Sequence, residues 1–337
     1  MIKYIDPEKV YISLLSGYNT YFDTEDYAET ITGEKAKVLQ HTKSKELYYA
    51  TPISTPANLI NNEWFINKWR KLIEYPCDSS LLWPVDFIRK DLGLPQSYLV
   101  YEFCPCSQYN SISELSKNKD YLGIENPHIR AITLNFIRAF ESIDEKGYLF
   151  FGIDDDEIFA NTNNNSLLIP INENLSIDKD SEIPFVEEEF FSEVVDPYHY
   201  ATRSKNDQGK EICVYDSLSE NYAFVSMIFR LLIGLYPYEG PMMDEYEYNL
   251  DSAENKDWIF KYIQTPVFIF DREDKSNSIE MYNKNRVHRE RWSQLTERLR
   301  EMFSNSLVQA NVMRINKFIY SPKEWRLAVE EAFKNFA

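Results

Sequence analysis

The sequence predicts an α+β protein with two lobes, a small mixed β/α lobe followed by a larger, mostly helical lobe. Apolar runs typical of strands, such as ELYYATPI (46–53) and SYLVYEF (97–103), lie in the first third of the chain. Helical patterns dominate the rest, and 337 residues exceed one average domain. We expect a small lobe over 45–103 and a large lobe over 104–337. The role of residues 1–44 stays open, with the first strands of the small lobe as one interpretation.

The composition is typical of a folded, acidic protein. Hydrophobic residues make up 44% of the chain and aromatic residues 15%, which argues against disorder. There are 36 Lys and Arg against 54 Asp and Glu, so the formal net charge is -18. Such a field repels nucleic acid and anionic lipid, and it suits either solubility or a basic protein partner.

The cysteines and the start of the chain indicate a cytoplasmic protein. Four scattered cysteines, Cys77, Cys104, Cys106 and Cys213, do not form the pattern of a disulfide framework. A single C-x-C pair in a chain with only four His is a weak zinc signal. The start, MIKYIDPEKVYISLL, lacks the features of a signal peptide, and no apolar run approaches the length of a membrane span. We therefore expect no metal, no membrane and no export.

Helix and strand signals alternate up to residue 176. The stretch NNEWFINKWRKLIEYP (61–76) carries apolar residues at helical spacing, and 97–103 is typical of a strand. A further helix is expected from Pro127 to residue 146, with one apolar face: Ile129, Ile132, Phe136, Phe140 and Ile143. The asparagines at 163–165 predict a turn between two short strands.

The second half begins with an acidic stretch, 176–219, that is expected to be a long irregular loop. After it, 220–233 is apolar nearly all round, as in a helix buried at the centre of a lobe. Further helices are expected around 295–303 and over 322–336. The last one has a complete start signal, with Ser321 as N-cap, Pro322 at the first position and Glu324 closing a capping box.

This order of elements, with its residues, resembles a protein kinase. The stretch ENYAFVSMIFRLLIGLYPYEG (220–240) is similar to the central helix of the kinase large lobe and the turn after it. YLVYEFCP (98–105) resembles the last small-lobe strand and the hinge, which would make Tyr101 the gatekeeper and Glu102, Phe103 and Cys104 the hinge. The resemblance implies a two-lobed protein kinase-like fold.

Three further stretches resemble one bacterial branch of kinase-like proteins. They are LLWPVDFI (81–88), TPVFIFDREDKSN (265–277) and SPKEW (321–325). Members of this branch are encoded beside von Willebrand A-domain and PPM-type phosphatase proteins in tellurium-resistance-type stress operons. The resemblance therefore implies protein partners among the phosphatases, A-domain proteins or active kinase-like proteins of such operons.

Phosphoryl transfer needs a lysine on the phosphates, metal-holding Asp and Asn side chains, and an Asp that positions the acceptor hydroxyl. The resemblance places Pro52 at the lysine, Gly152 at the positioning Asp, Glu157 at the metal-binding Asn and Ile171 at the metal-binding Asp. Only Glu157 retains an oxygen ligand, so any metal would be held by Glu157 with Asp154. The other three positions have lost the required chemistry.

The resemblance also implies the loss of an ion pair. Ala-Thr-Arg at 201–203 stands where a kinase has the Ala-Pro-Glu of its activation segment, and Ile319-Tyr320 stands where the partner Arg-Pro would be. The acidic loop GYLFFGIDDDEIFAN (147–161) lies at the former catalytic loop. We interpret Asp154, Asp155 and Asp156 as members of a solvated turn.

These features predict a pseudokinase, a catalytically inactive protein that binds or regulates another protein and needs no cofactor. The expected partner surface contains four acids of the 176–219 stretch, Glu187, Glu188, Glu189 and Glu193. One alternative is a divergent kinase or other group transferase that uses the relocated acids. The other alternative is a small-molecule sensor that uses the former nucleotide cleft.

Overall fold

The computed structural model describes residues 10–15, 20–53, 63–90, 97–103, 106–118, 121–171, 175–180, 182–186, 196–198, 204–205, 209, 211–242, 266–280, 285–308, 312–315 and 319–336. The chain divides into two compact units. The first contains Met1–Asn110 and Leu168–Ile177, and the second contains Ser111–Leu167 and Asp178–Ala337.

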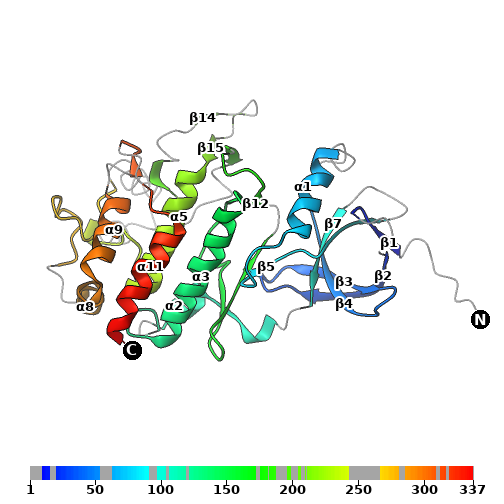
Figure 1. Cartoon of the computed structure of the whole chain (residues 1–337), viewed down its shortest axis with the longest axis horizontal. Helices are drawn as coiled ribbons and strands as arrows, with labels where there is room; N and C mark the ends of the chain where they lie inside the picture. The colour runs from blue at the N-terminus through cyan, green and yellow to red at the C-terminus, as the bar shows by residue number, and fades with distance from the viewer. Residues whose placement is uncertain are drawn as a thin grey trace, which may run out of the picture. The chain divides into compact units, whose positions relative to one another are not determined.

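The first unit is built around a closed antiparallel barrel, seen at the blue end of the chain in Figure 1. Its strands, in barrel order, are β1 (Val10–Ser13), β2 (Thr20–Glu29), β3 (Lys35–His41), β4 (Leu47–Pro52), β7 (Ser97–Glu102) and β6 (Asp86–Lys90). Strand β1 closes the barrel because it pairs on both sides: Tyr11 lies opposite Tyr21 of β2, and Ile12 lies opposite Arg89 of β6.

The barrel has a core that combines tyrosine rings with small aliphatic side chains. The buried cluster contains Tyr11, Tyr21, Leu39, Ala50, Ile88, Tyr98 and Val100. The rings of Tyr11 and Tyr98 meet edge to face, with centroids 5.4 Å apart. Asp86, only 3% exposed, accepts hydrogen bonds from Ser13 Oγ at 2.7 Å and from Tyr21 Oη at 2.9 Å. The buried charge therefore has partners on two other strands.

Helix α1 (Glu63–Glu74) packs against the barrel through Phe65, Trp69 and Leu72, all buried. The rings of Phe65 and Phe87 lie 5.8 Å apart, and Trp83 Nε1 donates to the carbonyl oxygen of Leu72 at 2.7 Å. Beyond the helix, β5 (Leu81–Leu82) pairs in parallel with the end of β11 (Ser166–Pro170). Among the described residues, this part of the chain also contains the short elements η2 (Cys106–Gln108), β8 (Asn110–Ser111) and β12 (Leu175–Ser176).

The second unit is organised around helix α5 (Ser217–Ile233), which runs beside α3 (Pro127–Glu145), with α3 next to α11 (Pro322–Phe333) (Figure 1). The ring of Phe224 lies 5.5 Å from Phe136 and 5.3 Å from Phe140. An ion pair of 2.7 Å joins Arg326 Nε on α11 to Glu141 on α3. The remaining helices of the described part are α2 (Ile112–Ser116), α8 (Arg286–Gln294), α9 (Glu297–Leu307) and η6 (Lys334–Phe336).

Gly234 ends α5 in the left-handed conformation, with a φ of 87°. Space as well as conformation requires glycine here, because a Cβ atom would lie 2.6 Å from Nη1 of Arg291. Arg291 is 2% exposed and pairs with Glu125, and it also donates to the carbonyl oxygen of Ile233.

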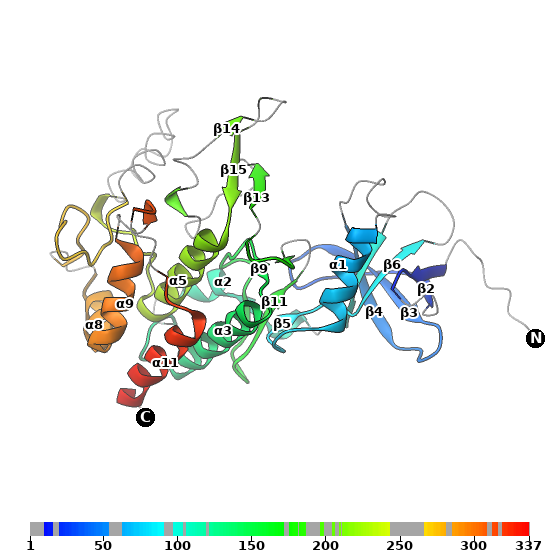
Figure 2. The same ribbon diagram turned by 45° about the horizontal axis from the view of Figure 1, so that its top comes forward.

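The second unit also contains strands. A three-stranded antiparallel sheet has the order β13 (Ile183–Val186), β15 (Glu211–Tyr215) and β14 (Ser204–Lys205), as Figure 2 shows. Strands β9 (Leu149–Phe150) and β10 (Phe159–Asn161) flank the acidic loop. The prediction of an irregular loop over 176–219 is therefore wrong for the residues of this sheet.

The predicted fold class is wrong. The first unit is a closed six-stranded antiparallel barrel where a small mixed lobe was expected, and strands accompany the helices of the second unit where a mostly helical lobe was expected. The two-lobed kinase-like fold is thus not the architecture of the chain. The physical reason lies in β1, since a strand that pairs with both β2 and β6 removes the open edges of the sheet.

Several individual elements are confirmed. The helices expected at 61–76, 127–146 and 220–233 correspond to α1, α3 and α5. The capping box of the last helix is present, because Ser321 Oγ accepts from the amide of Glu324 and the Glu324 carboxylate accepts from the amide of Ser321. Among the helices described, none is both long enough and apolar enough to cross a bilayer.

Candidate functional site

Pro52 is the last residue of β4 and lies opposite Tyr98 of β7. Its ring carries no charge, so this position offers nothing to a phosphate. Sequence reasoning missed a lysine on the neighbouring strand: Lys37 of β3 lies opposite Ala50, two residues before Pro52. The ammonium of Lys37 lies 2.8 Å from Asp23 Oδ2, and although burial lowers its pKa, the contact with Asp23 raises the pKa above its ordinary value.

The structure brings two predicted site residues of the first unit together. The hydroxyl of Tyr101 donates to the carbonyl oxygen of Ile171 at 2.7 Å, and both side chains are buried. The amide of Ile171 donates to Leu82, so its backbone is tied on both sides. An apolar side chain that is 0% exposed cannot coordinate a metal from this position.

The rest of the predicted hinge is more open. Glu102 is exposed at the end of β7, opposite Tyr48. Phe103 is 51% exposed, although its ring stacks on Tyr49 with centroids 4.5 Å apart. Cys104 lies outside the described residues, as do the four acids of the predicted partner surface, Glu187, Glu188, Glu189 and Glu193.

In the second unit, the loop after β9 contains the other predicted positions. Gly152 is buried and has a φ of 93°, a backbone conformation that glycine adopts without strain. Glycine has no side chain, so this position provides no proton acceptor. Glu157 is exposed, and its amide donates to the carbonyl oxygen of Asp154 at 3.2 Å.

The three aspartates of this loop place carboxylate oxygens within 4.8 Å of one another. Asp156 is exposed, as expected of a solvated turn, but that interpretation is wrong for Asp155, which is 7% exposed. Burial raises the pKa of Asp155 to about 6, while Tyr236, which donates a hydrogen bond of 2.5 Å, and Arg230 at 3.8 Å act against that rise. The carboxylate of Asp155 is thus engaged by protein groups, which weakens the case for a metal here.

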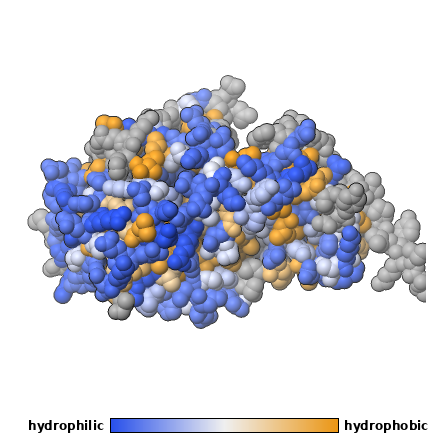
Figure 3. Space-filling model, in the orientation of Figure 1, coloured by the Kyte–Doolittle hydropathy of each residue, from blue (hydrophilic) through white to orange (hydrophobic). Residues whose placement is uncertain are grey.

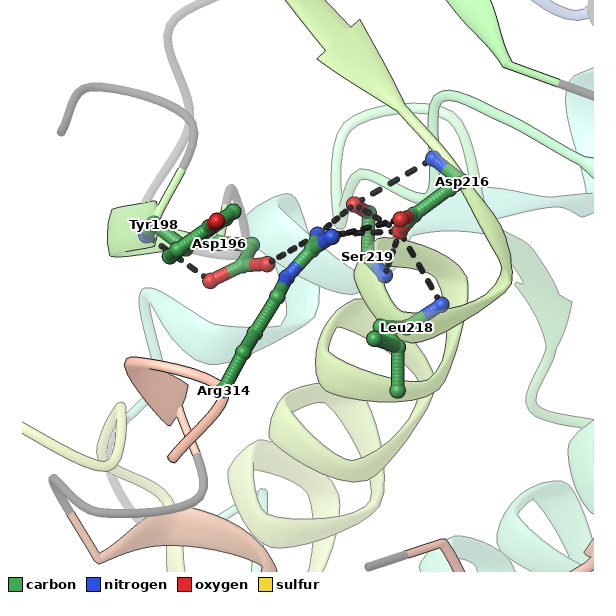
Figure 4. A network of polar contacts seen from close by, with 6 residues as sticks. All are labelled: Asp196, Tyr198, Asp216, Leu218, Ser219 and Arg314. Atoms are coloured by element: carbon green, nitrogen blue, oxygen red, sulfur yellow. Dashed lines mark hydrogen bonds and ion pairs between the residues drawn. The ribbon is translucent and has the colours of Figure 1, made fainter. Parts of the chain in front are cut away.

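Figure 4 shows a second charged network that sequence reasoning missed. The guanidinium of Arg314 contacts the carboxylates of Asp216 and Asp196, at 2.9 and 3.2 Å from Nη2, and the hydroxyl of Ser219 at 3.0 Å. The ring of Tyr198 lies 4.1 Å from the guanidinium carbon. The network ties the residues before α5, the segment around Asp196 and the turn at Arg314 to one another.

The two acids of this network differ in their pKa. Burial raises the pKa of Asp196, which is 3% exposed, to about 6. Burial also acts to raise the pKa of Asp216, but hydrogen bonds from Arg314 outweigh it and lower the pKa below its ordinary value. One side of the ion pair that was expected to be lost, residues 201–203, lies outside the described residues. A different acid–arginine pair is present between Asp196 and Arg314.

The sequence matches no protein-family model, and no curated protein shows significant similarity to it.

Proposed function

We propose that the protein is a non-catalytic binding module that acts by holding another protein, in line with the pseudokinase role that the sequence resemblance implies. The observation that carries this proposal is the chemistry of three positions. Pro52 has no charge, Gly152 has no side chain and Ile171 has a buried apolar one. Phosphoryl transfer depends almost entirely on positioned charges and metal ligands, and these residues supply neither.

The charge of the chain supports a basic partner. A net charge of -18 creates a negative field that attracts a basic protein surface and accelerates its association. On the face of the second unit seen in Figure 3, hydrophilic residues cover most of the surface, and the hydrophobic patches are small and separate. By resemblance, we propose the phosphatase, A-domain or active kinase-like proteins of stress operons as partners.

Pull-down experiments test the binding role. The full chain should retain a partner from these classes, and a variant with Glu187, Glu188, Glu189 and Glu193 changed to Gln should retain less of it. A matched control removes the same number of charges from exposed acids elsewhere: Glu273, Glu290, Glu301 and Glu331. Retention should fall above about 0.1 M salt, where screening becomes strong. Equal losses in both variants would assign the effect to net charge and overturn the proposed surface.

A radiolabel experiment tests the absence of catalysis. Incubation with γ-labelled ATP and Mg²⁺ should place no label on the protein or on a generic acceptor. Time-dependent labelling that disappears in Glu157→Ala would overturn the proposal.

One observation favours a second candidate, a group transferase with relocated chemistry. The carboxylates of Asp154, Asp155 and Asp156 lie close enough together to hold a cation. This candidate requires Mg-ATP to raise the melting temperature, and the Glu157→Ala change to remove that rise. The binding module requires neither effect.

A further inference from the structure

The second unit contains a pocket of about 360 Å³ that none of the predicted site residues line. Its walls come from the end of α3, the first turns of α5 and the residues that open α11. The volume lies within the range of about 300 to 1,000 Å³ typical of small-molecule sites. It is therefore large enough for one extended side chain or a ligand of similar size.

The walls of the pocket combine aromatic rings with carboxylates. Phe140 and Phe224 supply buried aromatic surface, and Ile319, which is 44% exposed, supplies an apolar rim. The acids are Asp144 on α3, Glu220 on α5 and Glu324 on α11. Among the residues that line the pocket, Lys179 is the only base, and it lies 3.8 Å from Asp144 with half of its side chain exposed. The pocket thus has an excess of negative charge beside aromatic walls.

The carboxyl of Glu220 has a hydrogen-bond partner for one of its two oxygens. Its Oε1 accepts a hydrogen bond of 2.6 Å from the amide of Phe150, and among the described residues no partner is found for Oε2. The pKa of this carboxyl is raised to about 8, mainly by burial and also by the charge of Asp144, while the Phe150 amide and Lys179 act in the opposite direction. The protein therefore holds a carboxyl in the wall of a pocket without supplying it a cation at short range.

We propose that this pocket binds an alkylguanidinium group, as carried by an arginine side chain of the partner protein. A guanidinium is planar and always charged, so it can stack on an aromatic face while it donates hydrogen bonds to carboxylate oxygens. Oε2 of Glu220 offers the acceptor, Phe140 and Phe224 offer the aromatic surface, and Asp144 lies at the rim. An arginine side chain would thus be the part of the partner that the pocket recognises, an assignment that rests on the proposed binding function.

The proposal implies that binding is linked to proton release. A guanidinium does not titrate near neutral pH, so the pH dependence must come from the protein. Below pH 8 Glu220 is mostly protonated and must lose its proton to pair with the cation, so affinity should rise up to about tenfold per pH unit until pH 8. The other groups around it are Asp144, Lys179 and Glu324, with the hydroxyls of three tyrosines, Tyr148, Tyr215 and Tyr320.

Calorimetric titration with agmatine tests the pocket directly. The wild-type chain should bind agmatine, more tightly at pH 8 than at pH 6.5, and release protons as it does so. Glu220→Gln keeps an acceptor for the Phe150 amide but removes the charge, so it should bind at least tenfold more weakly and lose the pH dependence. Glu301→Gln removes one exposed charge on α9 and should bind like the wild type. Asp144→Asn, at the exposed rim, gives an independent variant if Glu220→Gln does not fold.

Equal affinity of the wild type and Glu220→Gln for agmatine would overturn the inference, as would no binding at millimolar concentration. 1,4-Diaminobutane has an ammonium in place of the guanidinium of agmatine and carries the same charge of about +2. It should bind more weakly than agmatine, because an ammonium has no planar face to stack on an aromatic ring; equal binding of both would overturn the choice of guanidinium. A short arginine peptide that competes with agmatine supports the partner side chain as the source.

If Glu220→Gln still retains the partner in a pull-down, the inference fails while the proposed function stands. If agmatine binds but no partner is retained by any variant, the proposed function fails and the pocket remains a site for a free guanidinium ligand.

Discussion

Changing Glu220 to Gln should make the protein more stable at neutral and higher pH. The folded state raises the pKa of Glu220 from 4.5 to about 8, so between these values the folded chain holds a proton that the unfolded chain has released. The contribution of Glu220 to the free energy of unfolding is therefore greatest below pH 4.5 and falls as the pH rises toward 8. The Gln variant never carries the buried charge and loses this dependence.

The size of the effect follows from the pKa. Where the folded chain binds one proton more than the unfolded chain, the free energy of unfolding falls by about 1.4 kcal/mol for each pH unit. From pH 5 to pH 7 the wild type therefore loses at most about 3 kcal/mol of this free energy through Glu220. Solvent reaches the carboxyl through the pocket and weakens the penalty, so about 1 to 3 kcal/mol is the expected range. The other buried acids titrate equally in both proteins and cancel in the comparison.

Urea unfolding of both proteins at pH 5 and pH 7 measures this difference. The two should have similar free energies of unfolding at pH 5, and the variant should be the more stable at pH 7. Parallel pH dependences in the two proteins would refute the reasoning, because the carboxyl would then not carry a raised pKa. A variant that is less stable at pH 7 would also contradict the raised pKa, because it would mean that the carboxyl is ionised at this pH and that its charge strengthens the hydrogen bond from Phe150.

Three further predictions concern the interior. Phe224→Ala, at a position that is 2% exposed, should cost about 3 to 5 kcal/mol in urea unfolding, and a change under about 1 kcal/mol would contradict its central place. Arg314→Ala should lower the free energy of unfolding by about 3 to 5 kcal/mol at pH 7, because it leaves Asp196 buried without its cation. The loss should be smaller below pH 6, where Asp196 is protonated, and a loss that does not change with pH would contradict the pairing. Asp86→Ala should cost about 2 kcal/mol or more, since two buried hydroxyls lose their acceptor, and an unchanged thermal midpoint would show that the barrel interior does not depend on it.

The helices could be predicted because their signals are local. The apolar face of α3 repeats within its own sequence, and the start of α11 is encoded in four consecutive residues, Ser321 to Glu324. Neighbours in the chain become neighbours in the helix, so a short window contains most of the information. The same reasoning succeeded for α5, whose buried residues surround it on nearly every side.

The barrel could not be predicted in this way because its interior is partly polar. Ser13, Asp23 and Asp86 occupy strand positions where an apolar residue would have given a regular alternation. The partners of Asp86 lie far along the chain, because Asp86 is 73 positions from Ser13 and 65 positions from Tyr21. The short strand β1 therefore carried no apolar signal strong enough to show that it closes a sheet.

The buried charges of the second unit were missed for the same reason, and their partners differ in a way that bears on function. Asp155 has Tyr236 and Arg230, and Asp196 has Arg314, so each of these carboxylates is balanced by a cation within 4 Å that the chain itself provides. Glu220 has the amide of Phe150 and, among the described residues, no cation at such a distance. A carboxylate that is removed from water without a cation costs folding free energy, so Glu220 stays mostly protonated up to about pH 8 unless a cation from outside the chain pairs with it in the pocket. The acid that the fold leaves uncompensated is thus the one whose surroundings favour a positively charged group from outside the chain.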